Sequence, residues 1–152
     1  MTDDPLAFRL FNEIAIIEHL SRNAFAAVLP PGMTPAQFTV LNHFVRLGHK
    51  SRAPAQLARA MQVTRATMTS TLARMVKAGL VTMEGDPKDG RGKLVALTAE
   101  GRSMRERCLA ATATLLPVVG EILTGAELEA ILPLLAKLRQ RLDSLRDPSP
   151  EG

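Results

Sequence analysis

The stretch MQVTRATMTSTLARMVKAGLVTMEGDPKDGRGKLVAL, residues 61–97, decides the fold of this chain. Its first part places apolar residues at helical spacing and closes at Gly79, which predicts a helix over residues 64–78. Two segments rich in Val and Leu follow, residues 80–83 and 93–97, and predict paired strands. The basic, glycine-rich tip at 85–92 is too long for a tight turn, so we expect it to project as a wing. The helix stripe expected to be buried consists of Met68, Leu72, Met75 and Val76.

The opposite face of this helix carries small polar groups and arginines, and no acid. Thr64 is expected to cap its first turn. A carboxylate here would repel phosphates, whereas Arg, Ser and Thr donate to base edges and backbone oxygens, so the face suits the floor of a major groove. An ordinary amphipathic helix explains the apolar stripe but not the missing acids. The residues predicted to contact DNA from this helix are Thr64, Arg65, Ala66, Thr69, Ser70 and Arg74.

The segments before this stretch read as three helices. Residues 5–28 have a wide apolar face, and residues 34–47 begin with Thr34, Pro35 and Gln37, the pattern of a capping box. Residues 51–53 are expected to be extended. Pro54 then opens a short helix that ends at Met61, two or three residues before the helix at 64. A short helix, a tight turn and a second helix predict a helix-turn-helix.

Positive charge is concentrated in the same region. The chain has 152 residues and a net charge of +4. Residues 51–93 contain eight Lys and Arg residues and three acids, whereas the remainder contains 11 basic and 12 acidic residues. A phosphate-facing surface requires this distribution, although a solvated basic face without a partner has the same charge.

Composition narrows the class further. The length predicts one domain, or one domain with dimerising extensions, and 46% apolar residues suffice for a core. No apolar run is long enough to span a bilayer, and the acidic residues Asp3 and Asp4 argue against a secretory signal peptide. A single cysteine rules out an intrachain disulfide and indicates a cytoplasmic protein. We therefore expect no membrane partner.

The C-terminal third predicts helices without a globular body to cover. Thr98 is expected to cap the start of one helix, and Pro117 should kink or end it. Thr124 and Glu127 form a second capping box, and the last helix carries an almost continuous ridge of leucines up to Leu145. The economical explanation is that both terminal segments pack against a second copy of the chain. Residues 147–152 should be a disordered tail.

With these elements in place, the chain resembles the MarR family of winged helix-turn-helix regulators over residues 5–145. The most specific match is DPKDGRGKLVALTAEG at 86–101, which is similar to the family's wing signature, D-P-x-D-x-R leading into L-T-x-x-G. The segments QLA at 56–58 and GLV at 79–81 also match. The resemblance implies a mainly α fold with a small β-hairpin wing (α+β). It assigns dimerisation helices to residues 1–33 and 101–146, and the winged helix-turn-helix core to residues 34–100.

The resemblance also implies a mode of binding. Such proteins are cytoplasmic homodimers that bind double-stranded DNA at a pseudo-palindromic operator, with half-sites about 10 base pairs apart. Each protomer places the recognition helix in the major groove and the wing arginine, here Arg91, in the minor groove. Asp89 is expected to hydrogen-bond Arg91 and direct it. Many relatives have basic residues at the positions of Ser70, Met83 and Gly90, which implies fewer phosphate contacts here. The wing residues predicted to contact DNA are Lys88, Asp89, Arg91 and Lys93.

Three kinds of signal are considered. Members of the family often release DNA when a small aromatic or phenolic acid binds, and Val40, His43 and Leu47 are candidates for the wall of such a ligand pocket; a packed histidine is the plainer alternative. Redox sensing would use Cys108, which falls on an apolar helix face in a chain without tyrosine. The three histidines are scattered, so no metal site and no cofactor are expected.

Two other classes of function compete with a regulator. For an enzyme, the sequence offers no nucleophile–base pair and no phosphate-binding glycine loop. A winged-helix module that binds protein instead of DNA is the second rival, and the basic recognition face argues against it. Repression is the commoner mode in the family, but the chain itself does not distinguish a repressor from an activator.

Overall fold

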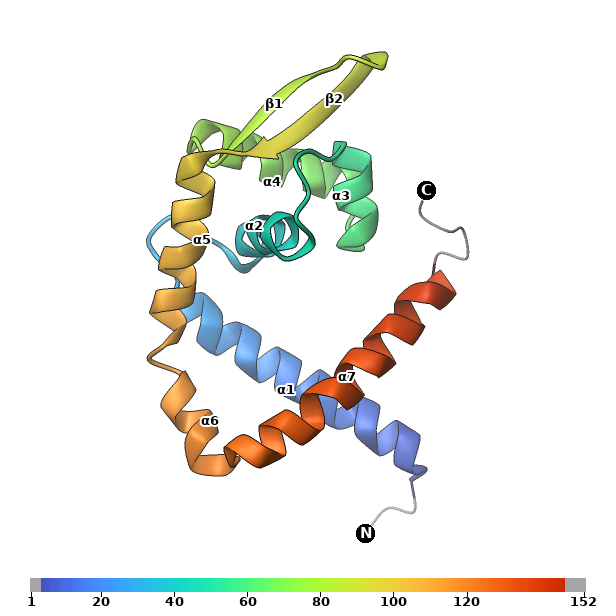
Figure 1. Cartoon of the computed structure of the whole chain (residues 1–152), viewed down its shortest axis with the longest axis vertical. Helices are drawn as coiled ribbons and strands as arrows, with labels where there is room; N and C mark the ends of the chain where they lie inside the picture. Colours follow the sequence, from blue (N-terminus) through green and yellow to red (C-terminus); the bar gives the residue numbers. More distant parts are fainter. Residues whose placement is uncertain (1–3, 147–152) are drawn as a thin grey trace. The chain divides into compact units, whose positions relative to one another are not determined.

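The computed structural model describes residues 4–146. They form two compact units, which divide between Ala113 and Thr114. The predicted division into dimerisation helices at 1–33 and 101–146 and a DNA-binding core at 34–100 stays a prediction. The tail expected at 147–152 lies outside the described residues. Figure 1 shows the elements in chain order: α1 (Leu6–Val28), α2 (Pro35–Leu47), α3 (Pro54–Ala60), α4 (Arg65–Lys77), β1 (Val81–Asp86), β2 (Asp89–Leu97), α5 (Ala99–Thr112), α6 (Leu116–Ile122) and α7 (Gly125–Arg146).

The core of the first unit lies among α2, α3, α4 and the base of the hairpin. Phe44 and Leu41 of α2 pack there with Leu57 of α3, Leu72 of α4 and Val95 of β2, all at most 1% exposed. Helix α2 enters this core through the predicted capping box. The Gln37 amide donates to the Thr34 hydroxyl over 3.2 Å, and the Thr34 amide donates to the Gln37 side chain over 3.0 Å. The mainly α fold with one small hairpin is therefore confirmed.

Helices α3 and α4 form the predicted helix-turn-helix. The turn between them holds Gln62 at a φ of 53°, a left-handed conformation that is costly for a side chain with a Cβ. Thr64 caps α4, because its hydroxyl accepts the Thr67 amide at 3.1 Å. Met68, Leu72 and Met75 are buried as predicted, but Val76 is 41% exposed, so its assignment to the buried stripe was wrong.

The hairpin turns more tightly than the sequence predicts. Its strands pair in antiparallel register from Val81 opposite Leu97 to Gly85 opposite Lys93, and Asp86 then pairs with Asp89. Only residues 87 and 88 remain in the turn, so the expectation that the tip is too long for a tight turn was wrong. The extra length is absorbed by a bulge, because residues 90–92 of β2 have no partner on β1. The hairpin still projects from the helices of this unit (Figure 1).

Two contacts fix the base of the hairpin. The predicted extended segment at 51–53 forms a one-residue bridge, in which Arg52 and Val95 exchange backbone hydrogen bonds of 2.9 and 2.8 Å. On the other side, the Thr98 hydroxyl donates to the Gly79 carbonyl over 2.6 Å and accepts the Gly101 amide at 2.9 Å. One threonine side chain therefore joins the end of α4 to the start of α5.

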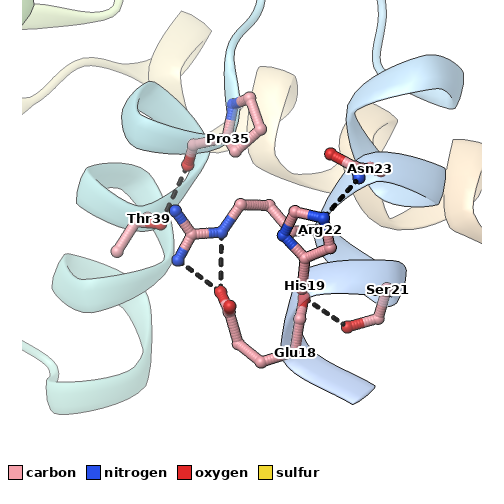
Figure 2. Close-up of polar contacts among 7 residues, drawn as sticks. All are labelled: Glu18, His19, Ser21, Arg22, Asn23, Pro35 and Thr39. Atoms are coloured by element: carbon pink, nitrogen blue, oxygen red, sulfur yellow. Dashed lines mark hydrogen bonds and ion pairs between the residues drawn. The ribbon is translucent and has the colours of Figure 1, made fainter. Parts of the chain in front are cut away.

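Helix α1 lies against α2 and α5. Phe25 and Phe38 meet edge to face, with ring centroids 4.9 Å apart. The polar contacts drawn in Figure 2 each stay within one helix: Arg22 pairs with Glu18 in α1, and Thr39 donates to the Pro35 carbonyl in α2. Most of the large apolar side chains of α1 are exposed in the single chain, including Phe8, Phe11, Ile17 and Leu20.

The second unit contains α6 and α7. Helix α5 ends at Thr112 and Pro117 lies in the first turn of α6, as the proline predicts. The capping box of α7 forms, since the Thr124 amide donates to Glu127 over 2.8 Å and the Glu127 amide donates back to the Thr124 hydroxyl over 3.3 Å. The leucine ridge is present and uncovered, with Leu132, Leu135, Leu142 and Leu145 all exposed.

Candidate nucleic-acid interface

The outward face of α4 is a continuous surface of exposed small and basic side chains. Buried residues on the opposite side hold the helix in place, and the Schellman motif at its end, in which the Leu80 amide donates to the Met75 carbonyl over 2.9 Å, sets the direction of the exit chain. Gly79, at a φ of 72°, is the residue that makes this motif feasible. All six predicted contact residues of this helix are exposed, namely Thr64, Arg65, Ala66, Thr69, Ser70 and Arg74.

The first turn of α4 exposes one more polar side chain, Thr67, which was not among the predicted contact residues. Thr67 is exposed, and its hydroxyl and amide both bond to the Thr64 hydroxyl, at 2.9 and 3.1 Å. The Thr71 hydroxyl donates to the Thr67 carbonyl over 3.0 Å. Thr64 was predicted to cap α4, and a capping side chain bonds the amide of the residue three positions later. The spacing from Thr64 therefore already pointed to Thr67.

The wing presents its predicted residues to solvent. Lys88, Asp89, Arg91 and Lys93 are all exposed. Two carboxylates shape the backbone of the turn: Asp86 accepts the Lys88 amide at 2.9 Å, and Asp89 accepts the Arg91 amide at 3.1 Å. Asp89 therefore hydrogen-bonds Arg91 as predicted, through the backbone amide and not through the guanidinium. Asp89 fixes the bulge from which Arg91 extends, and leaves the guanidinium to an outside partner.

The cations of this surface lack carboxylate partners. Within residues 4–146, no ion pair involves Arg65, Arg74 or Arg91. Some arginines outside the surface do have a carboxylate partner, as Arg139 pairs with Asp143 over 3.2 Å. Guanidinium groups without a carboxylate partner, raised on a helix and on a hairpin of the same unit, are suited to binding phosphates.

The residues predicted for a ligand wall lie in different environments. Val40 is fully buried in the core, His43 is half-buried and Leu47 is 43% exposed. The His43 ring stands 6.4 Å from Phe44 and 5.6 Å from His49, measured between ring centroids. Whether these three residues line a ligand site stays a prediction.

The thiol of Cys108 is buried inside the first unit. Burial raises its pKa, and the nearby Arg107 only partly offsets this rise. The thiolate, which is the reactive form, is therefore disfavoured at neutral pH. In the described part of the chain, no three side chains of His, Cys, Asp or Glu are grouped as metal ligands, and no helix is both long and apolar enough to cross a bilayer.

A helix-turn-helix followed by a hairpin with an exposed arginine, on one basic unit, defines a winged helix-turn-helix protein of the DNA-binding class. A family model for the MarR family matches residues 32–92. The transcriptional regulator HosA of Escherichia coli O111:H- is 36% identical over 113 residues, which cover 71% of this chain and 78% of HosA. The chain belongs to the MarR family and is a transcriptional regulator.

Solved structures agree with this assignment. Wild-type MarR from E. coli, in its apo form, matches with a TM-score of 0.75 and 28% identity, over 91% of this chain and 98% of that one. BpsR from Bordetella bronchiseptica matches with a TM-score of 0.63 and 25% identity, over 84% of this chain and 98% of that one. Both likenesses extend well beyond the residues that the family model covers.

Proposed function

We propose that this chain is a cytoplasmic homodimer that binds a pseudo-palindromic double-stranded DNA operator. In each protomer α4 enters the major groove, and the hairpin directs Arg91 into the adjacent minor groove. The observation that carries this proposal is the set of exposed arginines without carboxylate partners, Arg65 and Arg74 on α4 and Arg91 on the wing, in one unit. In a narrow minor groove the negative potential attracts a guanidinium group.

The exposed apolar faces of the terminal helices support the homodimer. A monomeric protein rarely exposes large contiguous apolar surface. Here Phe8 and Leu20 of α1 are 58% and 62% exposed, and Leu132 and Leu145 of α7 are 62% and 63% exposed. Association of two copies is the simplest way to remove such faces from water, and it supplies the two-fold symmetry that a pseudo-palindrome requires.

We propose repression as the regulatory mode and a small aromatic or phenolic acid as the signal. The related YetL of Bacillus subtilis is a transcriptional repressor, and the DNA binding of BpsR is regulated by 6-hydroxynicotinic acid. In this chain Val40, His43 and Leu47 remain the candidate wall residues, of which Val40 is fully buried. Control through Cys108 is the less favoured alternative, because the thiol is buried and its pKa is raised.

A gel-shift assay with sheared genomic DNA at low salt tests the proposal. The purified full-length protein should shift the DNA, and specific fragments should persist as salt increases. No binding at low salt would refute DNA recognition and would favour the alternative function, a winged-helix module that binds protein. Adding 6-hydroxynicotinic or salicylic acid to the complex tests the effector separately, with loss of the shift as the expected result.

Arg91→Ala provides a test of the wing. It should weaken binding and lower the slope of log affinity against log salt by about 0.9, the contribution of one phosphate contact. Arg9→Ala is the matched control, since Arg9 is also exposed but lies on α1. An unchanged salt slope for Arg91→Ala would exclude a role of this arginine at the phosphates.

A further inference from the structure

The start of α4 exposes apolar groups where a recognition helix meets the bases. Val63, just before the cap, is 38% exposed, and Ala66 and Thr67 in the first turn are exposed as well. Val63 is not one of the side chains that form or pack against the buried core. In helix-turn-helix proteins the N-terminal residues of the second helix contact base edges. The chemistry of these three side chains therefore bears on which bases are read.

Thr67 offers an apolar methyl group as well as its hydroxyl. The hydroxyl oxygen accepts a hydrogen bond from the Thr64 hydroxyl at 2.9 Å, and the Thr64 hydroxyl in turn accepts the Thr67 amide at 3.1 Å. With the oxygen directed at the helix cap, the γ-methyl is the part of this exposed side chain that is left to meet a partner. Thr69 and Ser70 are different, because neither hydroxyl has a hydrogen-bond partner within residues 4–146.

The apolar group that a base edge offers in the major groove is the 5-methyl group of thymine. We propose that Thr67, flanked by Val63 and Ala66, reads this methyl group at one thymine in each half-site of the operator. The inference rests on the proposed DNA-binding function and assigns part of its sequence specificity. Arg65 and Arg74 on the same helix supply the positive charge that selects a nucleic acid over an apolar protein partner.

The probe is a DNA operator that is selected by its binding to the full-length protein. Duplexes of random sequence are enriched by repeated binding, and each thymine of the selected site is then replaced in turn by deoxyuridine, which lacks only the methyl group. One symmetric pair of thymines should be sensitive. Each replacement there should weaken binding about four-fold, which corresponds to ~0.8 kcal/mol for burying one methyl-sized group.

Variants of Thr67 assign the effect to this side chain. Thr67→Ser keeps the hydroxyl that bonds Thr64 and removes only the methyl group, so thymine and deoxyuridine should be bound equally at the sensitive position. Thr67→Val keeps a methyl group and should retain the four-fold preference. Thr39→Ser, the same change at an exposed site on α2, is the control and should leave affinity and preference unchanged.

The outcomes separate the two proposals. Failure to enrich any duplex refutes DNA recognition and the thymine contact with it. A specific operator that tolerates deoxyuridine at every position overturns only the thymine inference. A preference for thymine that survives unchanged in Thr67→Ser also overturns it, because another side chain would then make the contact. Circular dichroism of Thr67→Ser should match that of the wild type.

Discussion

Replacing Gly101 by alanine places a methyl group where the carbonyl oxygen of Leu80 lies. A Cβ built at Gly101 overlaps that oxygen and comes within 3.2 Å of the Leu97 side chain. Leu80 is only 2% exposed, and its carbonyl accepts the Thr98 amide at 3.1 Å, so it has no free space to move into. The first turn of α5 must therefore shift away from the start of β1.

The cost has two parts. Overpacking at a tight site destabilises by about 1–3 kcal/mol, and loss of the bond from Thr98 to Leu80 adds about 1 kcal/mol. At roughly 2–4 °C per kcal/mol for a chain of this size, the sum lowers the melting temperature by on the order of 10 °C. Because Thr98 also bonds Gly79 at the end of α4, the shift should loosen the hairpin relative to the recognition helix and weaken DNA binding.

The assay is thermal unfolding followed by circular dichroism at 222 nm, with gel shift as the second readout. Gly120→Ala is the matched control: Gly120 also lies in a helix, but a Cβ there meets nothing within 4 Å. The control should be neutral or slightly stabilising, because alanine favours a helix over glycine. A Gly101→Ala melting temperature within 2 °C of the wild type would refute the close-approach argument.

Three further predictions concern conformation, assembly and titration. Gln62→Gly should raise the melting temperature by about 2–4 °C, because glycine removes the strain of roughly 1 kcal/mol that a left-handed conformation imposes on Gln62; a lower melting temperature than that of the wild type would show that Gln62 is not strained. Leu135→Asp should shift sedimentation from dimer to monomer without unfolding the protomer, whose α7 exposes this side chain; a persistent dimer would move the interface elsewhere. Cys108 should resist Ellman's reagent until urea is added. Burial raises the pKa of the Cys108 thiol in the folded state. The stability that this shift contributes is therefore fully present below the unfolded pKa of about 8.5, and it is lost as pH rises through the folded pKa. The urea midpoint should therefore fall less between pH 7 and pH 9.5 in Cys108→Ala than in the wild type.

Local signals predicted most of the fold because they depend on neighbouring residues only. The caps at Thr34, Thr64 and Thr98 form as expected, since a hydroxyl three residues before a free amide needs no tertiary context. The burial of Val76 was mispredicted for the opposite reason. Periodicity places Val76 at the margin of the apolar stripe, and only the packing of neighbouring elements decides how wide the buried face is.

The hairpin shows which features the sequence pattern could not predict. The strands were found from their Val and Leu content, but the turn was not, because strand register depends on pairing between residues far apart in the chain. The bulge at 90–92 lets residues 87 and 88 close the turn, and no local pattern requires that choice. Asp89 hydrogen-bonds Arg91 as predicted, but its spacing permits either the amide or the guanidinium as partner, and the bulge selects the amide.

The hydrogen bonds that begin α4 also limit what α4 can read. The Thr64 hydroxyl donates to the Thr67 hydroxyl and accepts the Thr67 amide, so both groups of Thr67 are turned toward the helix cap. Thr69 and Ser70 are exposed later in the helix and offer their hydroxyls for hydrogen-bonded readout, while the arginines supply charge. A variant such as Thr64→Ala would free the Thr67 hydroxyl, and should therefore change sequence preference as well as cost about 1 kcal/mol of stability. A stability loss with an unchanged preference would show that capping and readout are independent.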